Sequence, residues 1–514
     1  MAKIPYDIPS FNLLQHDFYW PISYDEYKFL SYEFVDKAID ILSTQDGDLH
    51  IALTCKLSDI IVDITNIARQ ALDIQRAEDL GHSLVYAAQH SPTCDWLLNS
   101  ANPADDRIVN RLKPNVRDDS IKTTLTLKAR MLKRILFHND GDDHYNTINF
   151  NLLMTEWLSS TDAQTHNLLT EYYINGRPQN GLQQSKDIAD SFKEIIFGQY
   201  DFAPKLCKAV ALGIEMVIER HISQSVGDLK ALKPSSLHKH LRKGLVSGTP
   251  KYEGRMLSWY FCEHNKDVIR FAHGGERVFY EDYAWPIAEL PYCSHYYAHS
   301  QAEAQSMSTR LQHGQYAPMP HTQDTAFLSQ GSLKHQELFQ PNVQPAQNKT
   351  LVYVTSVYEH DDAPGLPNFK TPDILYFEFQ TRLLGFLKKK GWRIVLKPHP
   401  KGLYTDKDYL SDYVDDIVKT PFDANQFEAE AFIFDFAGTA FFDTLATTQR
   451  SVLLNLGHRP IDAAERVSLQ KRCSVVDFGF DDRGRIELNE TTLSAAIENA
   501  PKNINNDFIK AYTV

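Results

Sequence analysis

The sequence has few cysteines, and they form no motif. Its 514 residues include six, which are scattered along the whole chain: Cys55, Cys94, Cys207, Cys262, Cys293 and Cys473. No two of them stand in a CxxC pair, and none lies in a His-Cys cluster of the kind that holds zinc. This usage predicts a reducing compartment and no zinc site.

Three further absences exclude whole classes of protein. No stretch approaches about 18 uninterrupted apolar residues, and Met1 to Asp7 lack the apolar core of a signal peptide, so we expect a cytoplasmic protein that is at most peripheral to a membrane. The formal net charge of -13 argues against general nucleic-acid binding. No Walker loop or GxGxxG motif is present, so nothing supports a nucleoside triphosphatase or a dehydrogenase.

The composition is that of an ordinary globular protein. Hydrophobic residues make up 43% of the chain and charged residues 23%, which is enough apolar material for sizeable cores. Since a domain commonly holds about 100 to 200 residues, a chain of 514 residues predicts two to four domains.

The clearest pattern lies between Trp392 and Gly457. Short apolar runs, typical of strands buried on both faces, stand at Trp392 to Leu396, Ala431 to Phe434 and Ser451 to Leu456. A helix-like segment from Ala440 to Thr447 separates the last two runs. This alternation predicts βαβ units in a parallel sheet, whose ligands bind at the carboxyl ends of the strands.

Two of these strand ends carry groups suited to phosphate. The first run stops at Lys397 to Pro400 (KPHP), where two prolines oppose both strand and helix, and where Lys397 and His399 supply donors. After the second run, Gly438 lets backbone approach a ligand, and Thr439 offers a hydroxyl at a helix start that favours an anion. A solvated loop histidine and an ordinary helix cap are the alternatives.

These two motifs resemble those of a known group of enzymes. KPHP, followed by Asp435 to Asp443 (DFAGTAFFD), is similar to the HP and S/T motifs of bacterial surface-polysaccharide transferases with the GT-B fold. Such enzymes include capsule-type transferases of Kdo (an eight-carbon keto-sugar acid) from CMP-Kdo, bacterial sialyltransferases and CDP-glycerol glycerophosphotransferases. The resemblance covers roughly residues 240 to 460, and the second motif has one Gly-Thr where several relatives have paired serines.

The resemblance implies both a fold and a set of roles. His399, Gly438 and Thr439 would hold the phosphate of a cytidine nucleotide donor, with Lys397 adding a further donor group. The implied fold is α/β and GT-B-like, with two Rossmann-like domains whose parallel sheets face a central cleft. No divalent metal and no cofactor is expected, because protein cations and helix dipoles would stabilise the departing phosphate.

A second candidate group follows the predicted strand Asp267 to Phe271. The loop after it, Ala272 to Arg277 (AHGGER), places a histidine and a glutamate beside two glycines. Paired glycines let backbone fold closely around a bound group, and His273 and Glu276 are residue types used for proton transfer near neutral pH. A tight turn with local hydrogen bonds is the alternative. The loop also resembles the His-Gly loop of the glycerophosphotransferases. This implies that His273 is the acceptor's base or a donor contact, with Glu276 as its alternative or its orienting partner.

We expect the chain to divide into three parts. Residues 1–299 are predicted to form an acceptor-side Rossmann-like domain with a helical insertion. Residues 300–349, rich in Gln, Ser, His and Pro, read as an interdomain connection. Residues 350–514 are predicted to form the nucleotide-donor domain, and the helical segment Thr491 to Ala500 is placed to cross back to the first domain.

The first hundred residues predict an α/β layer. Apolar residues recur at helical spacing from Tyr24 to Leu42. A strand at Leu49 to Thr54, a helix at Leu57 to Leu72 and a strand at Ser83 to Ala88 are expected to follow it.

A basic stretch between Lys230 and Lys243 is unusual in so acidic a chain. A run of charge is most often a solvated face. Alternatively, Lys239, Arg242 and Lys243 bind an anionic acceptor glycan or membrane headgroups, which would bring the protein to the cytoplasmic face of the inner membrane.

The function expected from these features is glycosyl transfer. A sugar, with Kdo or another ulosonic acid favoured, would pass from a CMP-sugar to a bacterial surface glycan such as capsule polysaccharide or lipopolysaccharide. A glycan or glycolipid acceptor would be the second partner, and no nucleic acid is expected. The alternatives are polyol-phosphate transfer from CDP-glycerol, a sugar-nucleotide epimerase, and a non-catalytic glycan-binding or scaffold subunit.

Overall fold

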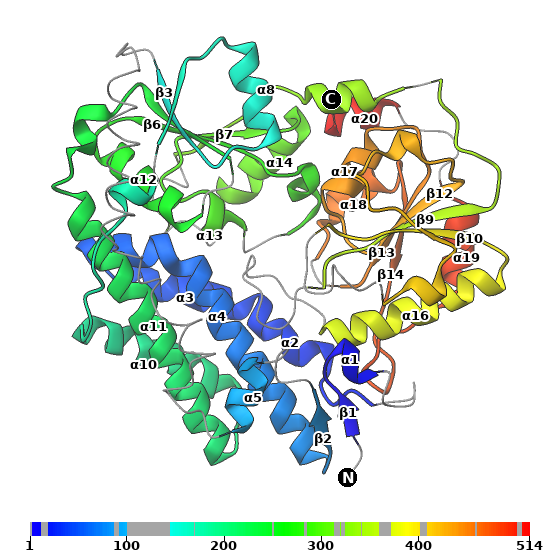
Figure 1. The fold of residues 1–514 in the computed structure, drawn as a ribbon, viewed down its shortest axis with the longest axis horizontal. Coiled ribbons are helices and arrows are strands. Elements are labelled where there is room, and N and C mark those ends of the chain that lie inside the picture. Colours follow the sequence, from blue (N-terminus) through cyan, green and yellow to red (C-terminus); the bar gives the residue numbers. More distant parts are fainter. Residues whose placement is uncertain are drawn as a thin grey trace.

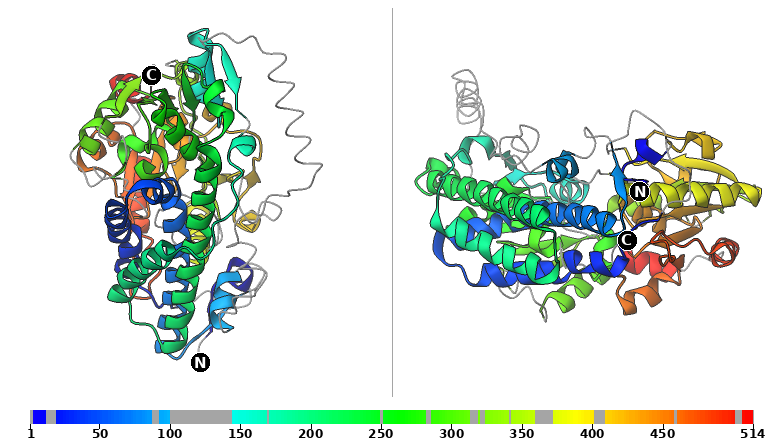
Figure 2. Two further views of the ribbon diagram at one scale, coloured as in Figure 1. Left: turned by 90° about the vertical axis from the view of Figure 1, so that its left-hand side faces the viewer. Right: turned by 90° about the horizontal axis from the view of Figure 1, so that it is seen from below.

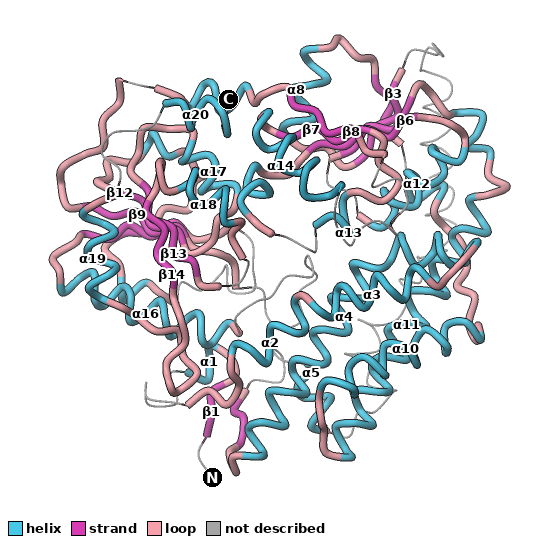
Figure 3. Tube along the Cα trace, turned by 180° about the vertical axis from the view of Figure 1, so that it is seen from behind, coloured by secondary structure: helices cyan, strands magenta, loops and turns pink. Residues whose placement is uncertain are grey.

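Two parallel sheets organise the molecule. The computed structural model describes residues 3–11, 19–86, 92–99, 144–168, 170–248, 251–281, 285–312, 319, 324–340, 342–358, 372–400, 409–457, 460–500 and 506–513. These residues build two six-stranded sheets, and every pairing described within them is parallel. Figure 1 shows the two sheets in separate domains, and Figure 3 shows the same two groups of strands from behind. The predicted α/β fold with two parallel-sheet domains is confirmed.

The first sheet has the strand order β4-β3-β5-β6-β7-β8. Its strands are β3 (Tyr145–Ile148), β4 (Thr165–Asn167), β5 (Gly244–Ser247), β6 (Asp267–Phe271), β7 (His295–Ala298) and β8 (Ala326–Ser329). Helices and 3-10 turns follow these strands: α8 (Leu152–Ser160), α9 (Thr170–Tyr173), η1 (Ser236–His240), α12 (Tyr252–Glu263), η2 (Gly275–Phe279), α13 (Trp285–Glu289), α14 (Gln301–Gln312) and α15 (Leu333–Leu338). Strand β6 begins and ends at the residues that the sequence predicted.

The second sheet has the doubly wound order β11-β10-β9-β12-β13-β14. Its strands are β9 (Thr350–Val354), β10 (Arg393–Lys397), β11 (Asp416–Ile417), β12 (Ala431–Phe434), β13 (Ser451–Asn455) and β14 (Ser474–Asp477). Its helices and 3-10 turns are α16 (Asp373–Lys389), η3 (Ser411–Tyr413), η4 (Ala424–Gln426), α17 (Thr439–Leu445), α18 (Ala463–Leu469), α19 (Glu490–Glu498) and α20 (Asn506–Tyr512). All residues of β9 and β12 are buried, which explains their continuous apolar sequences.

Long helices form a third layer beside the first sheet. They are α2 (Tyr24–Ser31), α3 (Glu33–Ser43), α4 (Gly47–Asp79), α5 (Pro92–Leu98), α10 (Gln183–Gln199) and α11 (Pro204–Leu232). Figure 2 shows α4 and α11 side by side although they are far apart in sequence. The two helices approach closely at Gly213 of α11, which has no side chain and so leaves room for Ile67 of α4. A Cβ on Gly213 would lie 3.0 Å from Ile67 Cδ1.

The predicted α/β layer at the start of the chain is wrong. Leu49 to Thr54 belongs to α4 and is helical, and the adjacent predicted helix Leu57 to Leu72 is part of the same element. Strand β2 (Ser83–Val85) does form, but it pairs with β1 (Lys3–Pro5) in a separate two-stranded sheet. A short apolar run such as Leu49 to Thr54 is compatible with a strand or with part of a helix. Here it is part of a helix, because α4 continues over 33 residues.

Both ends of the chain join the two domains. Near the N-terminus, α1 (Ile8–Phe11) packs on α16, where the rings of Phe11 and Phe377 meet edge to face at 5.3 Å. At the other end, α19 stays against β14 of its own domain, while α20 contacts α14 of the first domain. The helix expected at Thr491 to Ala500 is therefore present as α19, but the crossing back to the first domain is made by α20.

The first sheet extends beyond the expected boundary at residue 299. Helix α14 and strand β8 lie within residues 300–349, which the composition predicted to be a connection. Strand β8 pairs with β7, so the first domain continues at least to Ser329. Strand β9, the first strand of the second sheet in chain order, begins at Thr350. The polar composition of residues 300–349 did not indicate a strand. Strand β8 lies at the edge of the sheet, and its residues are partly exposed.

Candidate functional site

Three neighbouring strands of the second sheet, β10, β9 and β12, have their last residues paired side by side. Lys397 of β10 is opposite Val354 of β9, and Val354 is opposite Phe434 of β12. Strand order reverses between β9 and β12, and open parallel sheets bind ligands outside the carboxyl ends of their strands at such a reversal. The KPHP motif and the Gly-Thr loop therefore leave one edge of one sheet, on either side of β9.

A buried lysine stands at this edge. Lys397 is 5% exposed, and its Nζ contacts the Pro398 carbonyl oxygen at 3.3 Å. No carboxylate among the described residues pairs with it, and burial lowers the pKa of Lys397 below its ordinary value. An ammonium group buried without a counter-ion is costly. A bound anion would supply that counter-ion.

His399 lies two residues beyond Lys397 and is exposed. Pro398 and Pro400 on its two sides end β10 and hold the turn away from helix geometry. The His399 side chain therefore lies outside the core.

The buried carboxyl group of Asp435 fixes the start of the Gly-Thr loop. It accepts hydrogen bonds from the Ser356 amide (2.9 Å) and from the hydroxyl groups of Tyr353 and Tyr376. Burial raises the pKa of Asp435, although these hydrogen bonds oppose the rise. The group links β9, β12 and α16, and so it holds the backbone that leads to Gly438.

Helix α17 begins at the predicted Gly-Thr pair. Gly438 occupies the position before the helix in extended conformation, and no side chain caps the free amides of the first turn. Thr439 is exposed, and its hydroxyl makes none of the hydrogen bonds described in the structure. These amides and this hydroxyl are donors that a phosphate would satisfy, provided that Lys397 supplies the charge.

The opposite end of α17 is occupied by a buried arginine. Arg472 is fully buried and donates to the carbonyl oxygens of Thr444, Leu445, Thr447 and Gln449 at 2.8 to 3.0 Å. Burial lowers the pKa of Arg472 to about 10. A cation at the C-terminus of a helix interacts favourably with the helix dipole. Arg472 therefore stabilises α17 at its C-terminal end.

The His273 loop of the first domain packs directly on α17. A Cβ on Gly274 would lie 3.1 Å from Thr439 Oγ1, and a Cβ on Gly275 would lie 1.8 Å from Phe442 Cε1. The two glycines, which the sequence interpreted as wrapping a ligand, therefore make room for the second domain. His273 itself is exposed beside this junction.

Glu276 is buried and held by an ion pair. Its Oε1 lies 3.2 Å from Arg277 Nη1, and Arg277 also pairs with Glu289 at 3.0 Å. Glu276 Oε2 has no hydrogen-bond partner among the described residues and lies 2.1 Å from the position of a Gly274 Cβ. No hydrogen bond between Glu276 and His273 is described, so the structure does not place Glu276 as the orienting partner of His273.

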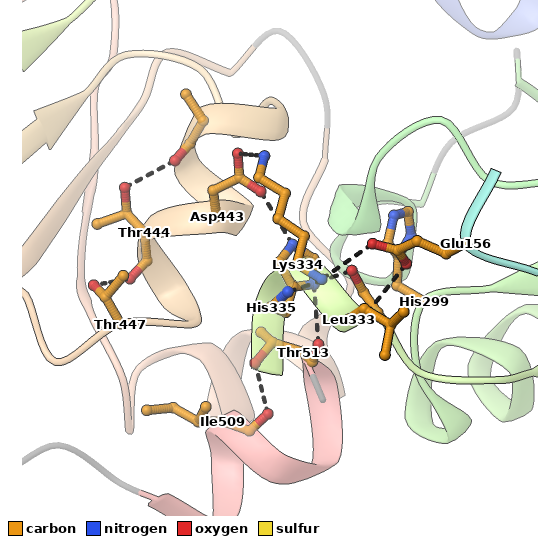
Figure 4. Close-up of polar contacts among 12 residues, drawn as sticks. Glu156, His299, Leu333, Lys334, His335, Asp443, Thr444, Thr447, Ile509 and Thr513 are labelled. Atoms are coloured by element: carbon orange, nitrogen blue, oxygen red, sulfur yellow. Dashed lines mark hydrogen bonds and ion pairs between the residues drawn. The ribbon is translucent and has the colours of Figure 1, made fainter. Parts of the chain in front are cut away.

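A polar cluster at the domain junction was not predicted from the sequence. Figure 4 shows Asp443 of α17 facing Lys334 and His335 of α15, with Thr513 after α20 on the other side of His335. Asp443 was part of the motif DFAGTAFFD, one helical turn after Thr439, and this spacing was the available signal. Nothing in the sequence around His335 marks it, because its partners are 108 and 178 residues away.

Comparison with known proteins finds no matching family model and no matching curated protein. Among solved structures, the chain is similar to UDP-GlcNAc 2-epimerase of Methanocaldococcus jannaschii in complex with UDP-GlcNAc and UDP (TM-score 0.36, 11% identity, covering 71% of this chain and 96% of that one). It is also similar to S. aureus MnaA with UDP (TM-score 0.37, 9% identity, 72% and 92%). A third similar structure is Phytolacca americana UGT2 complexed with UDP-2fluoro-glucose and pterostilbene (TM-score 0.30, 10% identity, 70% and 82%).

The basic stretch lies at the opposite edge of the first sheet from His273. Lys243 directly precedes β5, and its amide donates to the His144 carbonyl oxygen at the start of β3. The Arg242 amide donates to Asn146, and Lys239 is exposed nearby in η1. The structure therefore does not bring Lys239, Arg242 and Lys243 together with the candidate site.

Two further features are absent from the described residues. These residues contain no group of three His, Cys, Asp or Glu side chains that is placed to hold a metal ion. No helix among them is both long and apolar enough to cross a membrane.

Proposed function

We propose that this protein is a glycosyltransferase that takes its sugar from a nucleotide donor and binds the donor phosphate at the carboxyl edge of the second sheet. The observation that carries the proposal is Lys397, a buried ammonium that has no acidic partner within the described part of the chain. It is in register with the strands that lead to the Gly-Thr loop. The resemblance of KPHP and DFAGTAFFD to the HP and S/T motifs favours a CMP-sugar, with Kdo or another ulosonic acid as the sugar.

Charge stabilisation would be the main catalytic effect. When the bond between sugar and phosphate breaks, negative charge grows on the departing nucleotide. Lys397, His399, and the hydroxyl and amides at Thr439 would stabilise that charge, so the proposed reaction needs no divalent metal and no cofactor.

The acceptor hydroxyl would lose its proton to His273. The exposed imidazole stands where the first domain meets the start of α17, and a histidine is suited to proton transfer near neutral pH. Glu276 is the weaker candidate, because it is buried and already paired with Arg277. The acceptor proposed is a bacterial surface glycan or glycolipid, reached in the cytoplasm.

The basic stretch would act separately from the chemistry. Lys239, Arg242 and Lys243 lie at the amino edge of the first sheet. We propose that they contact a distant part of the anionic acceptor or the inner-membrane surface. Neutralising them would then weaken binding to anionic vesicles without altering nucleotide binding.

Thermal stabilisation by nucleotides tests the proposal. The purified protein is heated with CMP, CDP, UMP, UDP, GDP or ADP at one concentration, since a ligand that binds only the folded state raises the melting temperature according to its affinity. The same series is run on Lys397→Met, which removes the charge but keeps an apolar chain of similar length. Lys389→Met is the matched control, because Lys389 is exposed in the last turn of α16.

The expected result is a shift with CMP or CDP that Lys397→Met loses and Lys389→Met keeps. A larger shift with CDP than with CMP would favour polyol-phosphate transfer from a CDP donor, which shares both motifs. A preference for uridine nucleotides would overturn the cytidine assignment but keep the phosphate site. No shift with any nucleotide would contradict the enzyme proposal and favour a scaffold subunit.

A further inference from the structure

The short helix α15 contacts both domains at once. Its first amides, those of Leu333 and Lys334, donate to the Glu156 carboxylate of α8 in the first domain at 3.1 and 3.0 Å. The Lys334 ammonium contacts Asp443 of α17 in the second domain at 2.6 Å. His335 adds two contacts, to Asp443 through Nε2 at 3.0 Å and to the Thr513 carbonyl oxygen through Nδ1 at 2.9 Å. We call this set of contacts the α15 bridge.

The partners of His335 determine how many protons its ring carries. A carbonyl oxygen only accepts hydrogen bonds, so Nδ1 must carry a proton towards Thr513. Burial would raise the pKa of Asp443, but the hydrogen bond from His335 and the charge of Lys334 outweigh burial and lower it. An ionised Asp443 also only accepts, so Nε2 must carry a proton as well. The geometry is therefore complete only when His335 is an imidazolium.

Two aromatic rings and a further titratable pair lie around His335. Phe442 of α17 packs against its ring with the centroids 5.0 Å apart, and His299 after β7 lies at 5.5 Å. His299 is itself close to the buried Glu303 of α14, with 3.6 Å between Nδ1 and Oε2. The charged and titratable groups that face His335 are thus Asp443, Lys334, His299 and, behind His299, Glu303.

The bridge holds the helix that starts at the proposed phosphate site. Asp443 lies one turn after Thr439 on α17. Phe442, between them, packs against Gly275 of the first domain. Losing the second proton of His335 would take the His335 donor away from either Asp443 Oδ1 or the Thr513 carbonyl oxygen, while Lys334 still holds Asp443 Oδ2. A buried polar atom without its partner is unfavourable.

We propose that His335 is a positioning residue for the donor site, which as an imidazolium ties α17 to α15 and to the C-terminal segment, and so keeps Thr439 in place for a nucleotide phosphate. This inference rests on the proposed function. It predicts that nucleotide affinity falls when His335 loses its second proton. His335 touches no substrate in this account and acts only through α17.

The test measures cytidine nucleotide affinity by calorimetry at about pH 5 and about pH 9, which are below and above the ordinary histidine pKa and below that of lysine. His335→Gln removes the titrating ring, and His335→Lys keeps a cation that does not titrate in this range. His238→Gln is the matched control, since His238 is exposed in the first domain. Each variant is compared with wild type at the same pH, so that titration of the nucleotide itself cancels.

We expect wild type and His238→Gln to bind about 10-fold more weakly at the higher pH, a typical size for coupling between sites. His335→Gln should bind weakly at both values, and His335→Lys should lose the pH dependence. If His335→Gln lowers the melting temperature but keeps wild-type affinity and pH dependence, His335 is merely structural and the inference fails.

A second readout separates failure of this inference from failure of the proposed function. If no nucleotide binds at any pH, the proposed function fails, and hydrogen exchange of the α17 amides, corrected for intrinsic rates, decides the inference alone. If the α17 amides of wild type become less protected from exchange at alkaline pH, while those of His335→Lys do not, the result supports the α15 bridge. Equal pH dependence in both proteins overturns it.

Discussion

Gly275 and Phe442 are in close contact at the junction of the two domains: the Phe442 ring lies where a side chain on Gly275 would be. A Cβ on Gly275 would lie 1.8 Å from Cε1 of Phe442, and Phe442 also packs against the rings of His299 and His335. The glycine belongs to the loop that carries His273, and the phenylalanine belongs to the helix that starts at Thr439. The tight contact therefore sets the spacing between the proposed acceptor base and the proposed phosphate site.

Replacing this glycine tests whether that contact matters. Gly275→Ala should destabilise the protein by about 1 to 3 kcal/mol, because the added methyl group overlaps the Phe442 ring. The free energy of unfolding is measured by denaturant titration. Gly385→Ala is the control: no atom lies within 4 Å of its Cβ position, so in mid-helix it should stabilise by about 0.5 to 1 kcal/mol. Equal effects of the two substitutions would show that the domains do not meet here as described.

Arg472 should be among the most sensitive positions of the second domain. Arg472→Met leaves several buried carbonyl oxygens at the end of α17 without donors, which we expect to cost about 3 kcal/mol or more. Arg466→Met is the comparison, since Arg466 pairs with Asp477 at a partly exposed position and should cost about 1 kcal/mol or less. A loss of stability no larger for Arg472→Met than for Arg466→Met would remove Arg472 from the account of α17.

Asp36 on α3 gives a prediction about pH. Burial, together with the charges of Asp40 and Glu33, raises its pKa to about 6. A carboxyl group whose pKa is higher in the folded than in the unfolded state stabilises the fold at low pH, and this stabilisation is lost as the pH rises from about 4 to about 6. Above about pH 6, Asp36→Asn should therefore stabilise the protein, by about 1 kcal/mol after allowance for solvent screening.

The measurement is the melting temperature as a function of pH. Asp36→Asn should match wild type near pH 4 and exceed it above about pH 6. Asp187→Asn, at an exposed site on α10, should shift the curve little at any pH. A difference between Asp36→Asn and wild type that does not grow as the pH rises from about 4 to about 6 would contradict the prediction.

His399 should matter for turnover and not for folding. Because the side chain is exposed, His399→Ala should leave the melting temperature within about 1 °C of wild type. Turnover should fall by about 100-fold or more if the ring stabilises charge on the departing phosphate. Near-normal turnover of the purified variant with a cytidine nucleotide donor would exclude His399 from the mechanism.

The sequence predicted best the strands that are buried on both faces. Ala431–Phe434 and Asp267–Phe271 coincide with β12 and β6. Both are short runs rich in apolar residues, as is typical of strands inside a parallel sheet. Leu49 to Thr54 failed because a run of that length suits a strand or part of a helix, and only the long apolar stripe of α4 resolves the choice.

The geometry of the candidate site was predicted only in part. Lys397 and the Gly-Thr loop leave the sheet at the same end because its strands are parallel, and the alternating runs predicted parallel strands. The α15 bridge was not predicted, because the contact of His335 with Asp443 joins residues 108 positions apart and depends on how the two domains meet. The role of Gly274 and Gly275 was likewise hidden, since a close approach to a ligand and a close approach to another domain require the same residue type.

Calorimetric titration of CMP into wild type, Lys397→Met and Lys389→Met tests the central claim most directly. If Lys397 is the buried cation that receives the donor phosphate, Lys397→Met should bind CMP at least about 10-fold more weakly, with a weaker dependence on salt, while Lys389→Met binds like wild type. Equal CMP affinity in all three proteins, or no binding to the folded wild type, would contradict the claim that this edge of the sheet is a nucleotide phosphate site.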